Sequence, residues 1–190
     1  MKRIAVFCGS SFGNKEIYKE QAMLLGKVLA NQRIDLIYGG AKVGLMGAVA
    51  NGALKEGGTV IGVLPRFLQY KELVHEQLKE LILVDSMHER KLKIQELSHG
   101  AIALPGGVGT LDELFEMFTW AQLGLHNKPI AILNVNGYYD TLICLLEEMV
   151  KKGFLNSRNR QMLLYSDNIY ELLEMMKNYS VLPDKELINI

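Results

Sequence analysis

Short apolar runs recur along the chain, and each is followed by a turn and then by an amphipathic stretch. Continuous apolar runs of this length are typical of strands buried on both faces, whereas apolar residues spaced three or four apart indicate helices. We expect strands at residues 4–8, 34–38, 60–64, 81–84, 101–104, 129–133 and 162–165. We expect helices at residues 15–31, 45–56, 86–99, 110–124, 138–152 and 169–179.

This alternation predicts an α/β fold with a parallel sheet of about seven strands and helices on both faces. No repeat, low-complexity tract or linker divides the 190 residues, so we expect a single domain over residues 1–190, with 181–190 as a C-terminal tail. In such folds ligands bind beyond the carboxyl ends of the strands, at a topological switch point. The three glycine-rich turns, which follow the first, second and fifth expected strands, would all lie on that edge.

The most informative turn follows the fifth expected strand and reads Leu104-Pro105-Gly106-Gly107-Val108-Gly109-Thr110-Leu111-Asp112-Glu113. Its glycines let the backbone approach a ligand, and the free N–H groups of the next helix favour an anion such as phosphate. The turn has neither the Gly-Lys-Ser/Thr of a Walker loop nor the G-x-G-x-x-G spacing. We expect Glu113 in the first helical turn, where the helix dipole favours an ionised carboxylate.

Glu113 also has a purely structural interpretation. Thr110 and Glu113 fit a capping box, in which the two side chains only close the start of the helix. Three glycines and a proline ahead of them exceed what a cap requires, so the functional interpretation is favoured.

The turn at residues 39–47, after the second expected strand, also has two interpretations. Its glycines either expose backbone donors to a ligand or allow close packing of helix on strand. A nicotinamide cofactor does not fit, because residues 9–13 lack the G-x-G-x-x-G spacing and no ribose-binding Asp or Glu ends the second strand. A smaller phosphorylated ligand, a mononucleotide, fits better.

Two adjacent bases, Arg90 and Lys91, follow a capping box at residues 86–89. The dipole disfavours cations at a helix start, and a bound anion such as phosphate would offset that cost. The alternative is a solvated charged face. His75 and His88 have neither metal-ligand spacing nor a partner cysteine, so we expect neither a metal nor a redox cofactor.

Charge and composition exclude several classes of protein. The 21 basic residues balance the 21 acidic ones, whereas nucleic acid or an anionic membrane calls for a basic excess. No segment has the roughly eighteen apolar residues that span a bilayer, and the N-terminal apolar run is too short for a signal peptide. We expect Cys8 and Cys144 to be buried free thiols and the protein to be cytoplasmic, without nucleic-acid or membrane partners.

Residues 105–113 match the P-G-G-x-G-T-x-x-E signature of the LOG family, the cytokinin riboside 5′-monophosphate phosphoribohydrolases, many of which were once labelled lysine decarboxylase. The chain resembles this family over nearly its whole length. Four further blocks resemble those of the family, in order: Cys8-Gly9-Ser10-Ser11, Tyr38-Gly39-Gly40, Val43-Gly44-Leu45-Met46-Gly47 and Met87-His88-Glu89-Arg90-Lys91.

The resemblance implies a Rossmann-like domain that forms a homodimer with active sites at the interface. It implies an N-glycosidase, similar to an AMP nucleosidase, that needs no cofactor. The reaction would split an adenine-type nucleoside 5′-monophosphate into free base and ribose 5-phosphate. Carried over by position, the catalytic pair is Arg90 and Glu113. The implied substrate contacts are Glu72, Arg90, Lys91, Gly107, Val108, Gly109, Thr110, Leu111, Asp112, Glu113 and Thr119.

The chemistry of the residues agrees with this implication. Cleavage of a ribosyl–nitrogen bond passes through an oxocarbenium-like cation, which a carboxylate such as Glu113 stabilises while it orients the water. Arg90 would either neutralise phosphate or polarise the leaving base. A pyridoxal-phosphate decarboxylase would need a Schiff-base lysine, and no lysine has a recognisable context for it. The alternative is a non-catalytic nucleotide carrier or sensor of the same fold.

Overall fold

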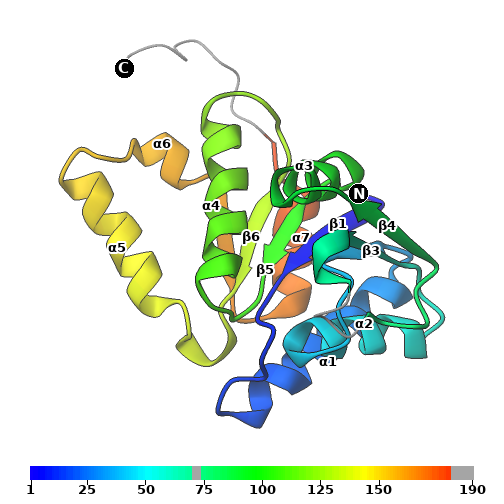
Figure 1. Cartoon of the computed structure of the whole chain (residues 1–190). Coiled ribbons are helices and arrows are strands. Elements are labelled where there is room, and N and C mark those ends of the chain that lie inside the picture. The colour runs from blue at the N-terminus through cyan, green and yellow to red at the C-terminus, as the bar shows by residue number, and fades with distance from the viewer. Residues whose placement is uncertain (70–73, 181–190) are drawn as a thin grey trace.

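The computed structural model describes residues 1–69 and 74–180, and these contain one sheet of seven parallel strands (Figure 1). The order across the sheet is β4-β3-β2-β1-β5-β6-β7. The bounds are β1 Arg3–Phe7, β2 Asp35–Tyr38, β3 Val60–Pro65, β4 Glu80–Val84, β5 Ala101–Ala103, β6 Ile130–Leu133 and β7 Leu163–Ser166. The predicted parallel α/β sheet is therefore confirmed, with strand ends shifted by a residue or so.

The switch point of the sheet lies between β1 and β5. Strand β1 pairs with β2 on one side and with β5 on the other, with Ala5 opposite Ala101 and Phe7 opposite Ala103. The chain first builds the sheet outward from β1 to β4 and then returns to add β5, β6 and β7 on the other side. The turns after β1 and β5 therefore diverge beyond the carboxyl ends of these two strands, where a cavity forms in sheets of this kind.

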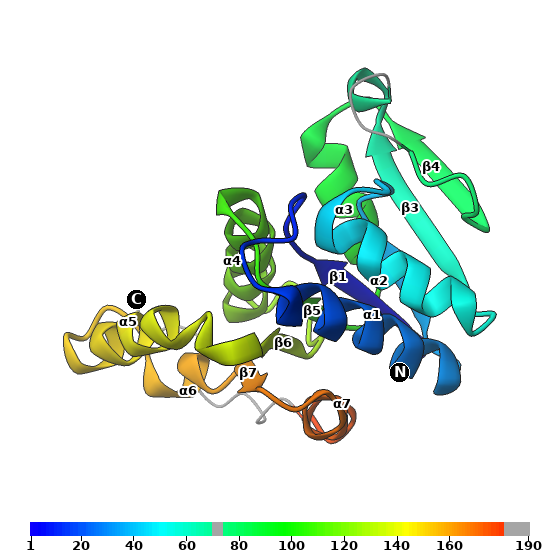
Figure 2. The same ribbon diagram turned by 90° about the horizontal axis from the view of Figure 1, so that it is seen from below.

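Helices cover both faces of the sheet (Figures 1 and 2). One face is covered by α1 (Glu16–Asn31), α2 (Gly44–Lys55) and α7 (Ile169–Lys177). The other is covered by α3 (Met87–Leu97), α4 (Val108–Gln122) and α5 (Asp140–Lys151). A short α6 (Ser157–Arg160), absent from the sequence prediction, and the 3₁₀ turns η1 (Arg66–Leu68) and η2 (Val135–Gly137) complete the elements.

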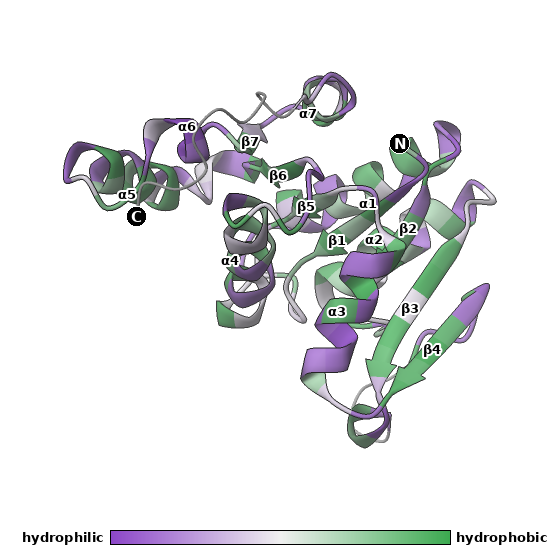
Figure 3. Cartoon of the chain, turned by 90° about the horizontal axis from the view of Figure 1, so that it is seen from above, coloured by the Kyte–Doolittle hydropathy of each residue, from purple (hydrophilic) through white to green (hydrophobic). Residues whose placement is uncertain are grey.

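Alternate residues of β1 supply the two halves of the core. Ile4 and Val6 pack toward α1 and α2, whereas Ala5 and Phe7 pack toward α3 and α4. Apart from the first residues, Arg3 of β1 and Asp35 of β2, the side chains of the central strands are buried and apolar (Figure 3). The continuous apolar runs in the sequence follow from this burial.

The small residues of α2 serve close packing against α1. A Cβ at Gly52 would overlap the carbonyl oxygen of Met23, and a Cβ at Gly26 would overlap that of Val49. The tight contacts at these two glycines therefore join α1 to α2. Within the described ranges, no helix is both long and apolar enough to cross a lipid bilayer.

Candidate active site

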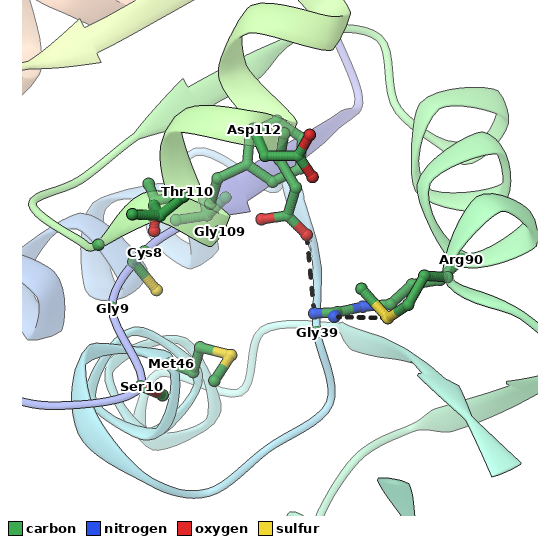
Figure 4. A pocket seen from close by; sticks show the side chains of 15 residues that line it. Cys8, Gly9, Ser10, Gly39, Met46, Arg90, Gly109, Thr110 and Asp112 are labelled. Carbon is green, nitrogen blue, oxygen red and sulfur yellow. Dashed lines mark hydrogen bonds and ion pairs between the residues drawn. The ribbon is translucent and has the colours of Figure 1, made fainter. Parts of the chain in front are cut away.

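A cavity of about 390 Å³ opens beyond the carboxyl ends of β1 and β5 (Figure 4). The turns after β1, β2 and β5 line it, together with the first turns of α3 and α4. The predicted site residues in its lining are Arg90, Gly107, Val108, Gly109, Thr110, Asp112 and Glu113. The sheet edge therefore brings together both members of the predicted catalytic pair and most of the signature turn.

The turn after β5 leaves part of its backbone open. Helix α4 begins at Val108, with Gly107 as its N-cap residue. Within residues 1–69 and 74–180, the N–H groups of Gly107, Val108 and Gly109 have no acceptor, as is usual for the first turn of a helix. A Cβ at Gly107 or Gly109 would meet no atom of the described part of the chain within 4 Å, whereas one at Gly106 would overlap the hydroxyl of Thr110. Only Gly106 is required by the protein's own packing, and the other two leave room for a ligand.

The start of α4 corrects two expectations about Glu113. Because Gly107 is the cap and no side chain caps this helix, Thr110 and Glu113 do not form a capping box. Glu113 is the sixth residue of α4 and lies in its second turn, so the free N–H groups of the first turn do not surround its carboxylate. The structural interpretation of Glu113 as a cap is therefore wrong, and so is the expected support from the dipole.

Glu113 and Arg90 face each other across the cavity from two different helices. Arg90 Nη2 lies 3.7 Å from Glu113 Oε1, and the two side chains are only 11% and 13% exposed. Burial raises the pKa of Glu113 from its ordinary value of 4.5 to about 7, although the charge of Arg90 acts in the opposite direction. The sequence favours the ionised form of this carboxyl, whereas the raised pKa places its titration near neutral pH.

Arg90 is a buried cation with an unsatisfied donor. Its Nε has no hydrogen-bond partner in the described part of the chain, and Nη1 contacts only the sulfur of Met87, at 3.9 Å. A Cβ at Gly39 would overlap Nη2, so the turn after β2 makes room for the guanidinium. A buried guanidinium with an unpartnered N–H favours an anionic or hydrogen-bond-accepting ligand in the cavity.

Lys91 lies beside the cavity and not in its lining. Its Nζ is 3.0 Å from Glu116 Oε1 and 3.3 Å from Asp112 Oδ2, so its charge is balanced by two carboxylates of α4. This ion pair fastens α3 to α4 and holds Arg90 opposite Glu113. A direct contact of Lys91 with substrate stays a prediction.

Two other predicted contacts, Leu111 and Thr119, are absent from the lining of this cavity. Leu111 is half-buried and packs into the core under α4. Thr119 is exposed, and it follows the first residue of α4 by three turns, so it does not line this cavity. Glu72 lies outside the described residues.

Sequence reasoning did not assign several residues that line the cavity, although most lie in the blocks that resemble the LOG family. They are Val6, Phe7, Cys8, Gly9, Ser10, Gly39, Met46 and Met87. Met46 and Met87 provide flexible apolar walls, which suit a flat ring such as a nucleobase. Among the described residues, no three His, Cys, Asp or Glu side chains gather as metal ligands.

Two of the glycines after β2, Gly44 and Gly47, serve packing. Gly44 has φ +57°, and a Cβ there would overlap the backbone of Ser10. A Cβ at Gly47 would overlap the carbonyl oxygen of Lys42. At these two positions the geometry favours close packing over ligand binding, whereas Gly39 of the same turn lines the cavity.

These features define a Rossmann-like α/β protein that carries an open glycine turn and a buried Arg–Glu pair at its switch point. The chain belongs to the LOG family. The family model described as "Possible lysine decarboxylase" matches residues 46–176.

Curated relatives resemble the chain over most of its length. It is 44% identical over 178 residues to cytokinin riboside 5′-monophosphate phosphoribohydrolase LOG1 of Arabidopsis thaliana. The aligned region covers 94% of this chain and 84% of that protein. It is 45% identical over 178 residues to LOG7 of the same plant, with 94% and 82% covered. It is 45% identical over 179 residues to the probable enzyme LOGL2 of Oryza sativa subsp. japonica, with 94% and 73% covered.

Solved structures share the fold at low sequence identity. The molybdenum cofactor binding protein of Rippkaea orientalis superposes with a TM-score of 0.71 at 22% identity, over 93% of this chain and 96% of that one. The Moco carrier protein of Chlamydomonas reinhardtii gives a TM-score of 0.70 at 20% identity, over 93% and 95%. These likenesses establish the architecture alone.

Proposed function

We propose that this protein is a phosphoribohydrolase. It cleaves the N-glycosidic bond of adenine-type nucleoside 5′-monophosphates, cytokinin riboside 5′-monophosphates among them, into free base and ribose 5-phosphate. The observation that carries the proposal is the buried carboxyl of Glu113, which stands between the open glycine turn and Arg90 in one cavity. The identity of 44–45% to enzymes named for this activity supports it.

The open turn is suited to the 5′-phosphate. The free N–H groups of Gly107, Val108 and Gly109 lie at the positive end of α4, which is a favourable environment for an anion. A phosphate held there would place the ribose deeper in the cavity, beside Glu113 on the second turn of the same helix. AMP is the simplest ligand that satisfies this arrangement.

Glu113 is suited to the chemical step. The bond between C1′ and the base nitrogen breaks, and its electron pair leaves with the base. The ionised carboxylate stabilises the positive charge that develops on the ribose and orients a water molecule toward C1′. The water gives its hydroxyl to C1′, and its proton passes to the departing base. Arg90 favours the ionised form of Glu113 and lines the cavity in which the substrate would be held.

A non-catalytic carrier of the same fold would need the glycine turn but not this pair. Burying a carboxyl and a guanidinium together costs desolvation free energy, which a binding protein has no reason to incur beside its ligand. The Arg90–Glu113 pair therefore supports hydrolysis over transport.

We also propose that two copies of the chain assemble and complete each other's sites. Helix α5 is amphipathic, yet Leu146 is its one buried residue, while Leu145 is 50% exposed. Leu123 and Leu125, at the end of α4, are 65% and 66% exposed. Thr119, on the same helix, is too far along it to reach its own cavity. A second copy would cover this apolar surface and bring Thr119 to the partner's substrate.

We also propose that the protein acts in the cytoplasm. Cys8 and Cys144 are both free thiols, in agreement with a reducing compartment. The expectation that both are buried was wrong, because Cys144 is exposed on α5.

The test is incubation with a panel of nucleoside monophosphates, nucleosides and lysine, with free base, ribose 5-phosphate and amine as readouts. Wild type should release base from AMP and from N6-prenylated AMP, and no amine from lysine. Glu113→Gln should keep AMP binding and lose base release by about a hundredfold or more, since it removes the charge that stabilises the transition state.

Glu174→Gln is the matched control, because Glu174 is exposed on α7, on the other face of the sheet. It should turn over AMP at the wild-type rate. A Glu113→Gln variant as active as this control would contradict the catalytic assignment.

A further inference from the structure

Two consecutive tyrosines, Tyr138 and Tyr139, donate hydrogen bonds to carbonyls of the turn after β5. Tyr139 donates its hydroxyl to the carbonyl of Leu104 at 2.7 Å, and Tyr138 donates its hydroxyl to the carbonyl of Gly106 at 2.5 Å. Both tyrosines lie in the loop between β6 and α5, and β6 is the strand next to β5. The loop that follows the neighbouring strand therefore supplies the hydroxyls that bind the turn.

The carbonyls of Pro105 and Gly107 also accept hydrogen bonds from the protein. The carbonyl of Pro105 accepts the N–H of Gly9 at 3.0 Å, and that of Gly107 accepts the N–H of Thr110 at 3.1 Å. Four successive carbonyls, from residue 104 to residue 107, are thus bound by protein groups. The N–H groups that follow them are the ones left free for a ligand.

The bond from Tyr138 fixes a particular peptide plane. In a trans peptide the C=O and the next N–H point in opposite directions. Because the carbonyl of Gly106 is held by Tyr138, the N–H of Gly107 must point to the opposite side of the turn. Of these two residues, Gly107 lines the substrate cavity and Gly106 does not, which places this N–H on the side of the substrate cavity.

Tyr138 acts from outside the substrate cavity. It lines a smaller cavity of about 230 Å³ on the far side of Gly9 and Gly107, and it is absent from the lining of the larger one. We therefore expect its effect on a ligand bound at the open N–H groups to pass through the Gly106–Gly107 peptide.

The tyrosine ring is itself held in place although 44% of its residue surface is exposed. It packs edge-on against Tyr139, with ring centroids 4.8 Å apart, and against Tyr18, at 5.9 Å. The loop is pinned by Asn134, whose side-chain oxygen accepts the N–H of Tyr139 at 2.8 Å. The hydroxyl of Tyr138 is thus pre-positioned before any ligand arrives.

We propose that Tyr138 is a positioning residue for phosphate recognition: it fixes the Gly106–Gly107 peptide so that the N–H of Gly107 faces the 5′-phosphate of the substrate. This role rests on the proposed function, because it needs a phosphate at the turn. It adds a residue from a second βα loop to the site without adding a substrate contact.

The test is Tyr138→Phe, which keeps the ring and removes the hydroxyl. Loss of one hydrogen bond that orients the phosphate donor should weaken binding of ribose 5-phosphate by about three- to tenfold and raise KM for AMP similarly. The value of kcat and the affinity for free adenine should stay within about twofold of wild type, since the phosphate contact is the same in ground and transition states. Calorimetry with ribose 5-phosphate and with adenine, alongside steady-state kinetics, provides the readouts.

Tyr170→Phe is the control, because Tyr170 is an exposed tyrosine of α7. Full ribose 5-phosphate affinity in Tyr138→Phe would overturn the positioning role, and so would an equal loss of affinity for adenine, which would indicate general loosening. A wild-type chain that binds no ribose 5-phosphate or releases no base from AMP would contradict the proposed function instead.

Discussion

The glycine turns after β2 and after β5 lie on the same edge of the sheet and are built from the same residue type, yet they differ in what surrounds them. In the turn after β2, a Cβ at Gly44 or Gly47 would overlap backbone atoms of the protein. In the turn after β5, a Cβ at Gly107 or Gly109 would meet no atom of the described residues within 4 Å. At these positions the first turn is closed by the protein itself, and the second is open.

The difference shows that a glycine in a βα turn is informative only once its surroundings are known. The closed turn contributes to stability through close packing. The open turn carries free N–H groups and stands beside a buried carboxyl with a raised pKa. These unsatisfied groups cost stability in the free protein, and a ligand that binds them stabilises the folded state.

The closed turn should show the largest stability change. Gly47→Ala places a Cβ on the carbonyl oxygen of Lys42, a backbone atom that cannot rotate away. We expect the free energy of unfolding to fall by about 3 kcal/mol, despite the better helix propensity of alanine. Urea unfolding followed by circular dichroism measures this. A loss below about 0.5 kcal/mol would mean that this turn is not closed.

The buried carboxyl of Glu113, which lies beside the open turn, should give a smaller change in stability, and this change depends on pH. Because the folded-state pKa of Glu113 is raised to about 7 from 4.5, the unfolded chain gives up this proton at lower pH than the folded chain. This group therefore lowers stability as pH rises from about 4.5 to about 7 and adds no further change above that interval.

We expect a contribution of about 2 to 3 kcal/mol across this interval. It is measured as the difference between wild type and Glu113→Gln in urea unfolding at a series of pH values. If the two proteins showed parallel pH dependence, Glu113 would have an ordinary pKa in the folded state.

The open glycines should give the smallest stability change, and of the opposite sign. Gly109 lies in the first turn of α4, where alanine is the better helix former and its Cβ has free space. Gly109→Ala should raise the free energy of unfolding by up to about 1 kcal/mol. It should also weaken ribose 5-phosphate binding, because the methyl group occupies the space where the phosphate approaches. A variant that binds as well as wild type would show that the space is not used.

The sheet was predictable because parallel strands buried on both faces must be apolar at every position. The runs at 4–8 and 101–104 therefore appear in the structure as β1 and β5, with ends shifted by about one residue. The start of α4 was placed two residues late, since Thr110 and Glu113 imitate a capping box while the true cap, Gly107, has no side chain to indicate it.

The pair Arg90 and Glu113 was predictable from residue type, position and family resemblance, but its electrostatics were not. The pKa of Glu113 depends on burial between α3 and α4, and that burial arises only when both helices pack on the sheet. The pairing of Lys91 with Glu116 has the same origin, since 25 residues separate them in the sequence and only the fold brings them into contact. No sequence motif indicates Tyr138, because its role depends on the pairing of β6 with β5 in the folded sheet.

The cavity at the switch point takes its walls from both halves of the polypeptide. Ser10 and Gly39 come from the portion that ends before β5, and Gly107 and Glu113 come from the portion that follows. A backbone cut just before β5 would leave each fragment with only part of the cavity lining. The first fragment would expose β1 as an unpaired edge strand, and the second would expose β5. Base release would then require the two pieces to reassociate, so that turnover becomes a direct reporter of fragment complementation.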